Sequence, residues 1–229
     1  MSSVASPPKR PMCARCLRAL SSCICHWITP LVPTVQVLIL QHPLEVHQAK
    51  GSARLLHLSL NGSVLISGEQ FSEAALRDLL YGASQSTPAQ AIQPVLLYPQ
   101  TPESGAPWSG IQADCAGPSA LSELSRVPRV RLVVLDATWR KSRKMLHLNP
   151  LLQHLPRLPL IDPPASQYRI RKAHRADQLS TLEASCHALA QLEHDDGKYL
   201  PLLQAFDGFV GQQGGYADAA GRKLSDAPA

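Results

Sequence analysis

Short apolar runs recur along the chain, and most are followed by a segment whose apolar residues have helical spacing. The strongest run, 130–135 (VRLVVL), is nearly continuous, which suits a strand covered on both faces of a parallel sheet. Further runs predict strands at 34–41, 64–66, 94–98 and 158–161. Strands that alternate with helices predict an α/β fold, built as a three-layer domain around a mainly parallel sheet.

The predicted helices have apolar residues three, four and seven positions apart. The clearest helix begins at a capping box, in which the Ser180 hydroxyl and the Glu183 carboxylate satisfy each other's backbone donors. Its buried stripe includes Leu182, Cys186 and Leu189. The other predicted helices are 47–60, 72–81, 139–148 and 200–210.

Composition divides the chain into four parts. Residues 1–11 are rich in Ser, Pro and Lys, and residues 211–229 in Gly, Ala and Asp, so both segments are expected to be disordered. Residues 12–30 hold a cysteine cluster, and residues 31–210 hold the α/β domain. The sequence has no run of 18 apolar residues and starts without the apolar core of a secretory signal. We therefore expect a cytoplasmic protein with no membrane partner.

Four of the six cysteines fall within thirteen residues. Their spacing is Cys13-x2-Cys16-x6-Cys23-x-Cys25. In a reducing cytoplasm, such a cluster favours metal binding over a disulfide framework. Four thiolates this close can fill one tetrahedral site, which predicts a small, structural zinc knuckle at the N-terminal side of the domain. An iron–sulfur cluster and four unrelated free thiols are the alternatives.

Polar and aromatic side chains gather where the central strand ends. Asp136, Thr138 and Trp139 follow that strand, at the edge of the sheet where open α/β folds bind their ligands. The helix that comes next is basic and has few acids nearby, which indicates an anionic ligand or partner. Its cations are Arg140, Lys141, Arg143 and Lys144. The alternatives are structural: Asp136 only caps the next helix, Trp139 only packs in the core, and the basic helix face is only solvated.

A second basic run supports a nucleic-acid partner, which the net charge of +5 fits without requiring it. The run follows Tyr168 and contains Arg169, Arg171, Lys172 and Arg175. Arginine pairing with phosphates, and bases stacked on Tyr168 or Trp139, would suit RNA; a solvated loop is the alternative. The sequence has no Walker or GxGxxG loop, which disfavours nucleoside triphosphates and dinucleotides.

Six motifs occur along the chain in a specific order. After the cysteine pairs come QHPLE at 41–45, LYP at 97–99, LDATW at 135–139, YRIR at 168–171 and STLEA at 180–184. Each motif is weak alone, but their order and spacing resemble the DTW-domain proteins, the tRNA-uridine aminocarboxypropyltransferases. The resemblance covers about residues 12–210. The chain departs from the family pattern at Gly51, Ser52, Gln100 and Ala137.

The resemblance implies a SPOUT-like fold with a trefoil knot, a rare exception to unthreaded chains. It implies S-adenosylmethionine as the donor and tRNA as the acceptor. The 3-amino-3-carboxypropyl group of the donor would move to N3 of a uridine, and methylthioadenosine would leave. Because N3 carries an imide proton, a positioned carboxylate must remove it. We assign that role to Asp136, with Thr138 holding its orientation and Trp139 beside it.

The same resemblance places the donor among loops that follow the strands, with Arg169 or Arg171 on its carboxylate. The other expected donor-binding residues are Leu97, Tyr98, Pro99, Ile161, Ser180 and Thr181. The cations of the two basic runs would bind tRNA. Two other functions stay open at this point: an RNA methyltransferase that uses the same donor, and a zinc-knuckle RNA-binding protein without catalysis. The oligomeric state, monomer or homodimer, is open as well.

Overall fold

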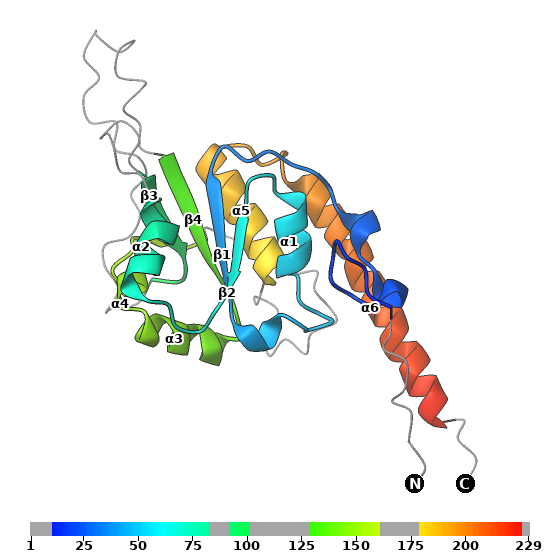
Figure 1. The fold of residues 1–229 in the computed structure, drawn as a ribbon. Coiled ribbons are helices and arrows are strands. Elements are labelled where there is room, and N and C mark those ends of the chain that lie inside the picture. The colour runs from blue at the N-terminus through cyan, green and yellow to red at the C-terminus, as the bar shows by residue number, and fades with distance from the viewer. Residues whose placement is uncertain (1–10, 83–91, 101–128, 161–178, 226–229) are drawn as a thin grey trace, which may run out of the picture.

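The computed structural model describes residues 11–82, 92–100, 129–160 and 179–225, with side chains through residue 213. Within these residues the strands form one sheet in which every neighbouring pair is parallel (Figure 1). The order across the sheet is β2 (Val64–Ser67), β1 (Gln36–Gln41), β4 (Arg129–Asp136), β3 (Ile92–Leu97) and β5 (Arg157–Leu158). The strongest apolar run is therefore the central strand, as predicted.

Helices cover both faces of the sheet and give the three predicted layers (Figure 1). Along β1, Val37 and Ile39 join one hydrophobic cluster, and Leu38 and Leu40 join the other, because successive strand residues point to opposite faces. The first face is covered by α1 (Ala53–Ser59), α5 (Thr181–Glu193) and α6 (Leu200–Ser225). The second face is covered by α2 (Glu73–Tyr81), α3 (Trp139–Leu148) and α4 (Pro150–Gln153).

The helix predicted over 47–60 is shorter than expected. A 3₁₀ turn forms at Pro43–Glu45, and α1 begins only at Ala53. The loop between them is held from outside: Arg18 Nη2 donates to the Gly51 carbonyl at 2.7 Å, and Arg18 Nη1 donates to the carbonyl of Ala49. These hydrogen bonds hold the loop against the cysteine segment, and the loop lies outside α1.

The C-terminal helix is longer than expected. The segment from Gly211, predicted to be disordered, is helical through Ser225. Packing beyond residue 210 supports this extension: Trp27 Nε1 donates to Gln212 Oε1 at 2.7 Å, and Gln213 is buried. The stretch 211–225 also contains no proline to end the helix. None of the helices in the described ranges is both long and apolar enough to cross a membrane.

The cysteine segment packs against α6 as a small module (Figure 1). It contains 3₁₀ turns at Leu20–Ser22 and Cys25–Trp27. The Trp27 ring lies directly on Gly208, where an added Cβ would come within 2.2 Å of the ring. Gln212 Nε2 also donates to the Cys23 carbonyl at 3.2 Å. The knuckle is thus docked on the domain by a specific contact with α6.

Candidate active site and cysteine cluster

Asp136 lies at the carboxyl end of β4 and is held from two sides. Its side chain is 6% exposed. Gln41 Nε2 donates to Oδ2 at 2.8 Å, and Thr181 Oγ1 donates to Oδ1 at 2.7 Å. Three elements, β1, β4 and α5, therefore meet at one carboxylate. This is the edge of a parallel sheet at which ligands bind in open α/β folds.

Local structure explains why these partners meet. Gln41 lies opposite Asp136 in the β1–β4 register, and the next residue, His42, donates its backbone N–H to the Asp136 carbonyl at 3.0 Å. Thr181 is the first residue of α5, whose start is fixed by the predicted capping box between Ser180 and Glu183. The carboxylate is consequently positioned by a strand register and by a capped helix start.

Two aromatic rings stand beside this carboxylate. Trp139 begins α3 and is 54% exposed, so it is not a core anchor. Its ring stacks on Tyr98 with a centroid separation of 5.1 Å and an interplanar angle of 6°. The buried Tyr98 hydroxyl lies 3.2 Å from the Ser142 Oγ, and this hydrogen bond holds the Tyr98 ring in place. The pair forms a rigid aromatic platform with one accessible ring.

A pocket of about 370 Å³ opens between β3, β4, β5 and the start of α5. Its volume lies in the range of small-molecule sites, about 300–1,000 Å³. Most of the lining is apolar, and the hydroxyl-bearing residues are Tyr98, Ser142, Ser180 and Thr181. Because Thr181 lines the pocket and also bonds Asp136, it connects the two. The apolar lining is Leu97, Pro99, Val134, Leu135, Ala137, Trp139, Leu158, Pro159, Leu160, Leu179 and Ala184.

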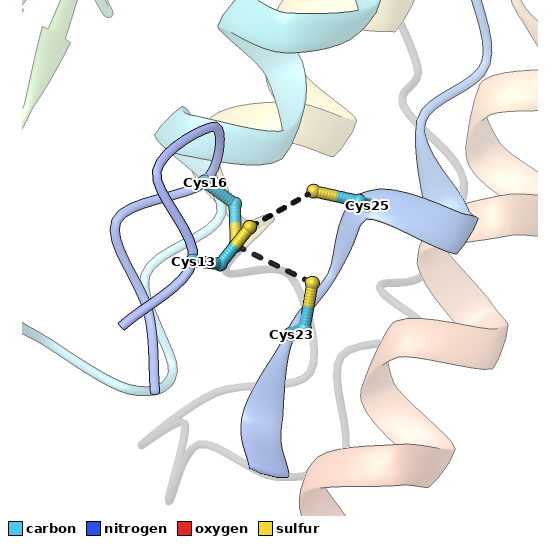
Figure 2. Close-up of side chains that lie close together, drawn as sticks. All are labelled: Cys13, Cys16, Cys23 and Cys25. Carbon is cyan, nitrogen blue, oxygen red and sulfur yellow. Dashed lines mark hydrogen bonds between the residues drawn. The ribbon is translucent and has the colours of Figure 1, made fainter. Parts of the chain in front are cut away.

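The four cysteines of the knuckle converge on one point (Figure 2). The Sγ atoms of Cys13 and Cys25 are 3.6 Å apart, and those of Cys16 and Cys23 are 3.7 Å apart. All four sulfurs lie within 4.8 Å of one another. Four sulfurs at about 2.3 Å from a tetrahedral zinc would be separated by about 3.8 Å. The spacing thus suits a tetrahedral metal and is far longer than a disulfide bond.

One of these thiols is set up to be a thiolate. Backbone N–H groups of Cys16 and Arg15 point at the Cys13 sulfur and lower its pKa to about 6. The tight turn behind them places Leu17 in the left-handed region, with φ at 58°. Metal-ligating cysteines bind as thiolates, so this turn favours the ligating form.

The knuckle reaches the active-site edge through a chain of contacts. Arg18 holds the Gly51 carbonyl, and the next residue, Ser52, accepts the Leu182 backbone N–H at 3.3 Å. Leu182 directly follows Thr181, which bonds Asp136. The loop 46–52 therefore lies between the cysteine cluster and the start of α5.

Comparison with known protein families decides the classification. A model described as the DTW domain matches residues 10–214. The chain belongs to the DTW-domain family. The match includes the cysteine cluster, all strands of the sheet and the start of α6.

Curated relatives of this DTW-domain protein carry the same kind of name. It is 28% identical over 213 residues to "tRNA-uridine aminocarboxypropyltransferase 2" of Macaca fascicularis, covering 90% of this chain and 65% of the relative. It is 30% identical over 198 residues to the protein of that name in Drosophila melanogaster, and the alignment covers 82% of this chain and 70% of the relative. It is 28% identical over 142 residues to "tRNA-uridine aminocarboxypropyltransferase A" of Arabidopsis thaliana, and the alignment covers 60% of this chain and 51% of the relative. A comparison with solved structures found no match.

The structure brings together most of the described residues that were predicted for the DTW-domain site. Leu97, Tyr98, Pro99, Ser180 and Thr181 line the pocket, and Trp139 stands at it. Ser180 has a further structural task, because its hydroxyl accepts the Glu183 N–H at 3.2 Å. The remaining predicted residues, Ile161, Arg169, Arg171, Lys172 and Arg175, lie outside the described residues.

The residues that orient Asp136 are different from the predicted one. Thr138 is the exposed N-cap residue of α3, whereas Gln41 and Thr181 both donate hydrogen bonds to the carboxylate. One signal in the sequence points to Gln41: it is a polar residue that ends an apolar strand. Its pairing with Asp136 depends on the strand register, which the sequence pattern does not specify.

The basic helix α3 is not as free of acids as the sequence suggests. Lys141 Nζ lies 2.7 Å from the Glu45 carboxylate, and Lys144 Nζ lies 3.0 Å from that of Glu69. Lys144 and His42 together lower the pKa of Glu69. Arg140 and Arg143 are exposed and have no acidic partner among the described residues. The two arginines are therefore the available cations of this helix.

Proposed function

We propose that this DTW-domain protein transfers the 3-amino-3-carboxypropyl group of S-adenosylmethionine to N3 of a uridine in tRNA. Relatives that align with 82–90% of the chain are named tRNA-uridine aminocarboxypropyltransferases. The observation that carries the proposal is the position of Asp136: a carboxylate fixed from two sides, next to a small-molecule pocket and an accessible aromatic ring. This combination suits proton removal from a base that has been turned out of its stack.

The chemistry assigns Asp136 the role of general base. The carboxylate takes the imide proton from N3, and the freed electron pair of N3 forms a bond to the γ-carbon of the donor. The bond between that carbon and the sulfonium sulfur breaks, and its electron pair leaves with methylthioadenosine. The donor's sulfonium supplies the activation of the carbon. Gln41 and Thr181 hold the base in place during this step, which limits the motion that would misalign it.

The pocket suits the nucleoside part of the donor in size and chemistry. Its volume of about 370 Å³ and its apolar walls suit a nucleoside, and its hydroxyl groups offer hydrogen bonds. Leu97, Leu160 and Leu179 would contact the adenosine, while Thr181 lies on the side of Asp136.

The aromatic platform and the basic helix suit the acceptor. A uridine stacked on the exposed face of Trp139 would lie close to the pocket, since Trp139 and Tyr98 both line it. Arg140 and Arg143, which are exposed near the start of α3, would bind the backbone phosphates of that RNA. We propose tRNA as the RNA on the strength of the relatives' names.

We also propose that the cysteine cluster binds one structural zinc ion. The sulfur spacing supports this, and four thiolates leave no coordination position for catalysis. The SPOUT-like knotted path and a cytoplasmic location stay predictions from the sequence.

The decisive experiment is a product analysis. Purified protein is incubated with S-adenosylmethionine and unmodified tRNA, and the digested nucleosides and the donor product are identified by mass spectrometry. We expect aminocarboxypropyluridine in the tRNA and methylthioadenosine in equal amount. A methylated nucleoside with S-adenosylhomocysteine would instead identify a methyltransferase. Binding of tRNA without any donor product would identify a non-catalytic RNA-binding protein.

A further inference from the structure

Arg157, at the start of β5, is a buried cation without an anionic partner in the described structure. Its side chain is 4% exposed. Its Nε and Nη1 are enclosed and have no hydrogen-bond partner among the described residues. Burial also lowers the pKa of this guanidinium. An enclosed guanidinium is unfavourable unless acceptors pair with its N–H groups, and an anionic ligand is one acceptor that would pair with the two N–H groups left open here.

The position of Arg157 connects it with the pocket. Arg157 does not itself line the pocket, but it directly precedes Leu158, Pro159 and Leu160, which do. Its guanidinium lies over the Tyr98 ring in a cation–π contact, with the guanidinium carbon 5.2 Å from the ring centroid, and Tyr98 lines the pocket. An anion held by Arg157 would therefore belong to a ligand beside the aromatic platform.

Other described cations near this edge are less suited to a ligand inside the pocket. Lys141 and Lys144 are paired with Glu45 and Glu69. Arg140 and Arg143 are exposed on the outer surface of α3. A phosphate on a bulky polynucleotide would meet these exposed arginines more readily than an enclosed residue. A small carboxylate is the anion that best fits the burial of Arg157.

We propose that Arg157 binds the carboxylate of the amino-acid group of S-adenosylmethionine. The inference rests on the proposed function and gives the carboxylate to Arg157 in place of Arg169 or Arg171, which lie outside the described residues. The planar guanidinium can donate two parallel hydrogen bonds to a carboxylate. Anchoring this end fixes the carbon chain of the donor, so that the γ-carbon rather than the methyl group faces uridine N3. Arg157 would thus select which group is transferred.

The test compares ligands with and without the carboxylate by isothermal titration calorimetry. The ligands are S-adenosylmethionine, its decarboxylated form and methylthioadenosine, and the variant is Arg157→Gln. We expect Arg157→Gln to weaken S-adenosylmethionine binding about tenfold or more, because a charge-assisted pair is lost. Its affinities for the two ligands without a carboxylate should stay within about twofold of wild type. Wild-type protein should itself bind the decarboxylated form about tenfold more weakly than S-adenosylmethionine.

A matched control is Arg131→Gln, since Arg131 is a partly buried arginine of the same sheet whose N–H groups bond Gln36 and the Leu79 carbonyl. It should leave S-adenosylmethionine affinity unchanged. Equal weakening of all three ligands by Arg157→Gln would overturn the proposal, as would selective loss of tRNA affinity. The decarboxylated ligand tests the wild-type protein even if Arg157→Gln unfolds: equal affinity with S-adenosylmethionine overturns the proposal. If wild type binds neither sulfonium ligand, the proposed function itself is contradicted.

Discussion

One substitution at Asp136 removes the charge of the side chain and keeps its shape. Asparagine keeps the size of the side chain, can accept the Gln41 N–H and can donate to the Thr181 hydroxyl, but cannot take the N3 proton. We expect Asp136→Asn to lower the transfer rate about a hundredfold or more, with the melting temperature and donor affinity nearly unchanged. Single-turnover kinetics, calorimetry and thermal denaturation measure the three quantities.

The pH dependence gives a second readout of the same role. A general base must be ionised to take the proton, so the wild-type rate should rise with pH, and this rise should be lost in Asp136→Asn. Asp78→Asn, an exposed carboxylate on α2, is the matched control and should behave as wild type. Near-normal turnover by Asp136→Asn would make Asp136 structural. Glu45 and Glu183 would then be the next candidates, although one pairs with Lys141 and the other caps α5.

Thr181 offers a test of positioning rather than of proton transfer. Thr181→Val removes the hydroxyl that donates to Asp136 at 2.7 Å while keeping a β-branched side chain. Because a hydrogen bond to a charged group is lost, we expect kcat to fall about tenfold, with the fold intact. Thr181→Ser restores the hydroxyl and should recover most of the rate. Equal activity of the Val and Ser variants would contradict a role for this bond.

Single residues were predictable where they depend on local sequence. Asp136 and Trp139 follow an apolar run, so their place at the edge of the sheet could be inferred from the pattern alone. Gln41 could not be paired with Asp136 in the same way, because the two are 95 residues apart and meet only through the β1–β4 register. Arg157 escaped notice for a similar reason: its burial arises from packing around Tyr98.

At the scale of elements, the cysteine knuckle makes a metal prediction. Purified protein should contain about one equivalent of zinc by elemental analysis, and Cys13→Ser or Cys23→Ser should lose it, since each removes one of four ligands. Chelation should also lower the melting temperature, because the knuckle packs on α6 through Trp27 and Gln212.

Cys186 provides the matched control for that experiment. It is a free cysteine buried in α5, outside the cluster, and Cys186→Ala should retain the full metal content. If the protein instead contains iron and sulfide and absorbs visible light, the cysteines hold an iron–sulfur cluster rather than zinc. A metal-free protein with unchanged stability and activity would leave four free thiols as the correct interpretation.

Elements were predictable where periodicity alone decides them. The strands β1, β2, β3 and β4 follow their apolar runs, and α5 follows its capping box, because an apolar run and a local cap are each encoded within a few residues. The start of α1 and the end of α6 depend on distant partners. Arg18 holds the loop before α1, and Trp27 holds α6 beyond residue 210.

At the scale of the whole molecule, the charge arrangement predicts how RNA affinity responds to salt. Phosphate contacts release counterions, so each lost contact lowers the salt slope by about one. Arg140 and Arg143 are exposed, whereas Lys141 and Lys144 are already paired with acids. We therefore expect Arg140→Glu with Arg143→Glu to weaken tRNA binding strongly and to reduce the slope of log Kd against log salt by about two.

The same measurement can show whether the ion pairs matter. Lys141→Gln removes a cation that Glu45 already neutralises, so its effect on the salt slope should be smaller than that of either arginine change. Arg77→Glu, at an exposed position of α2 that pairs with Glu73, controls for a general loss of positive charge and should shift affinity only slightly. Fluorescence anisotropy with labelled tRNA at several salt concentrations gives both quantities. If the arginine variants keep the wild-type slope while Arg77→Glu lowers it, the RNA crosses the face of α2 instead, and the acceptor must reach Asp136 from that side.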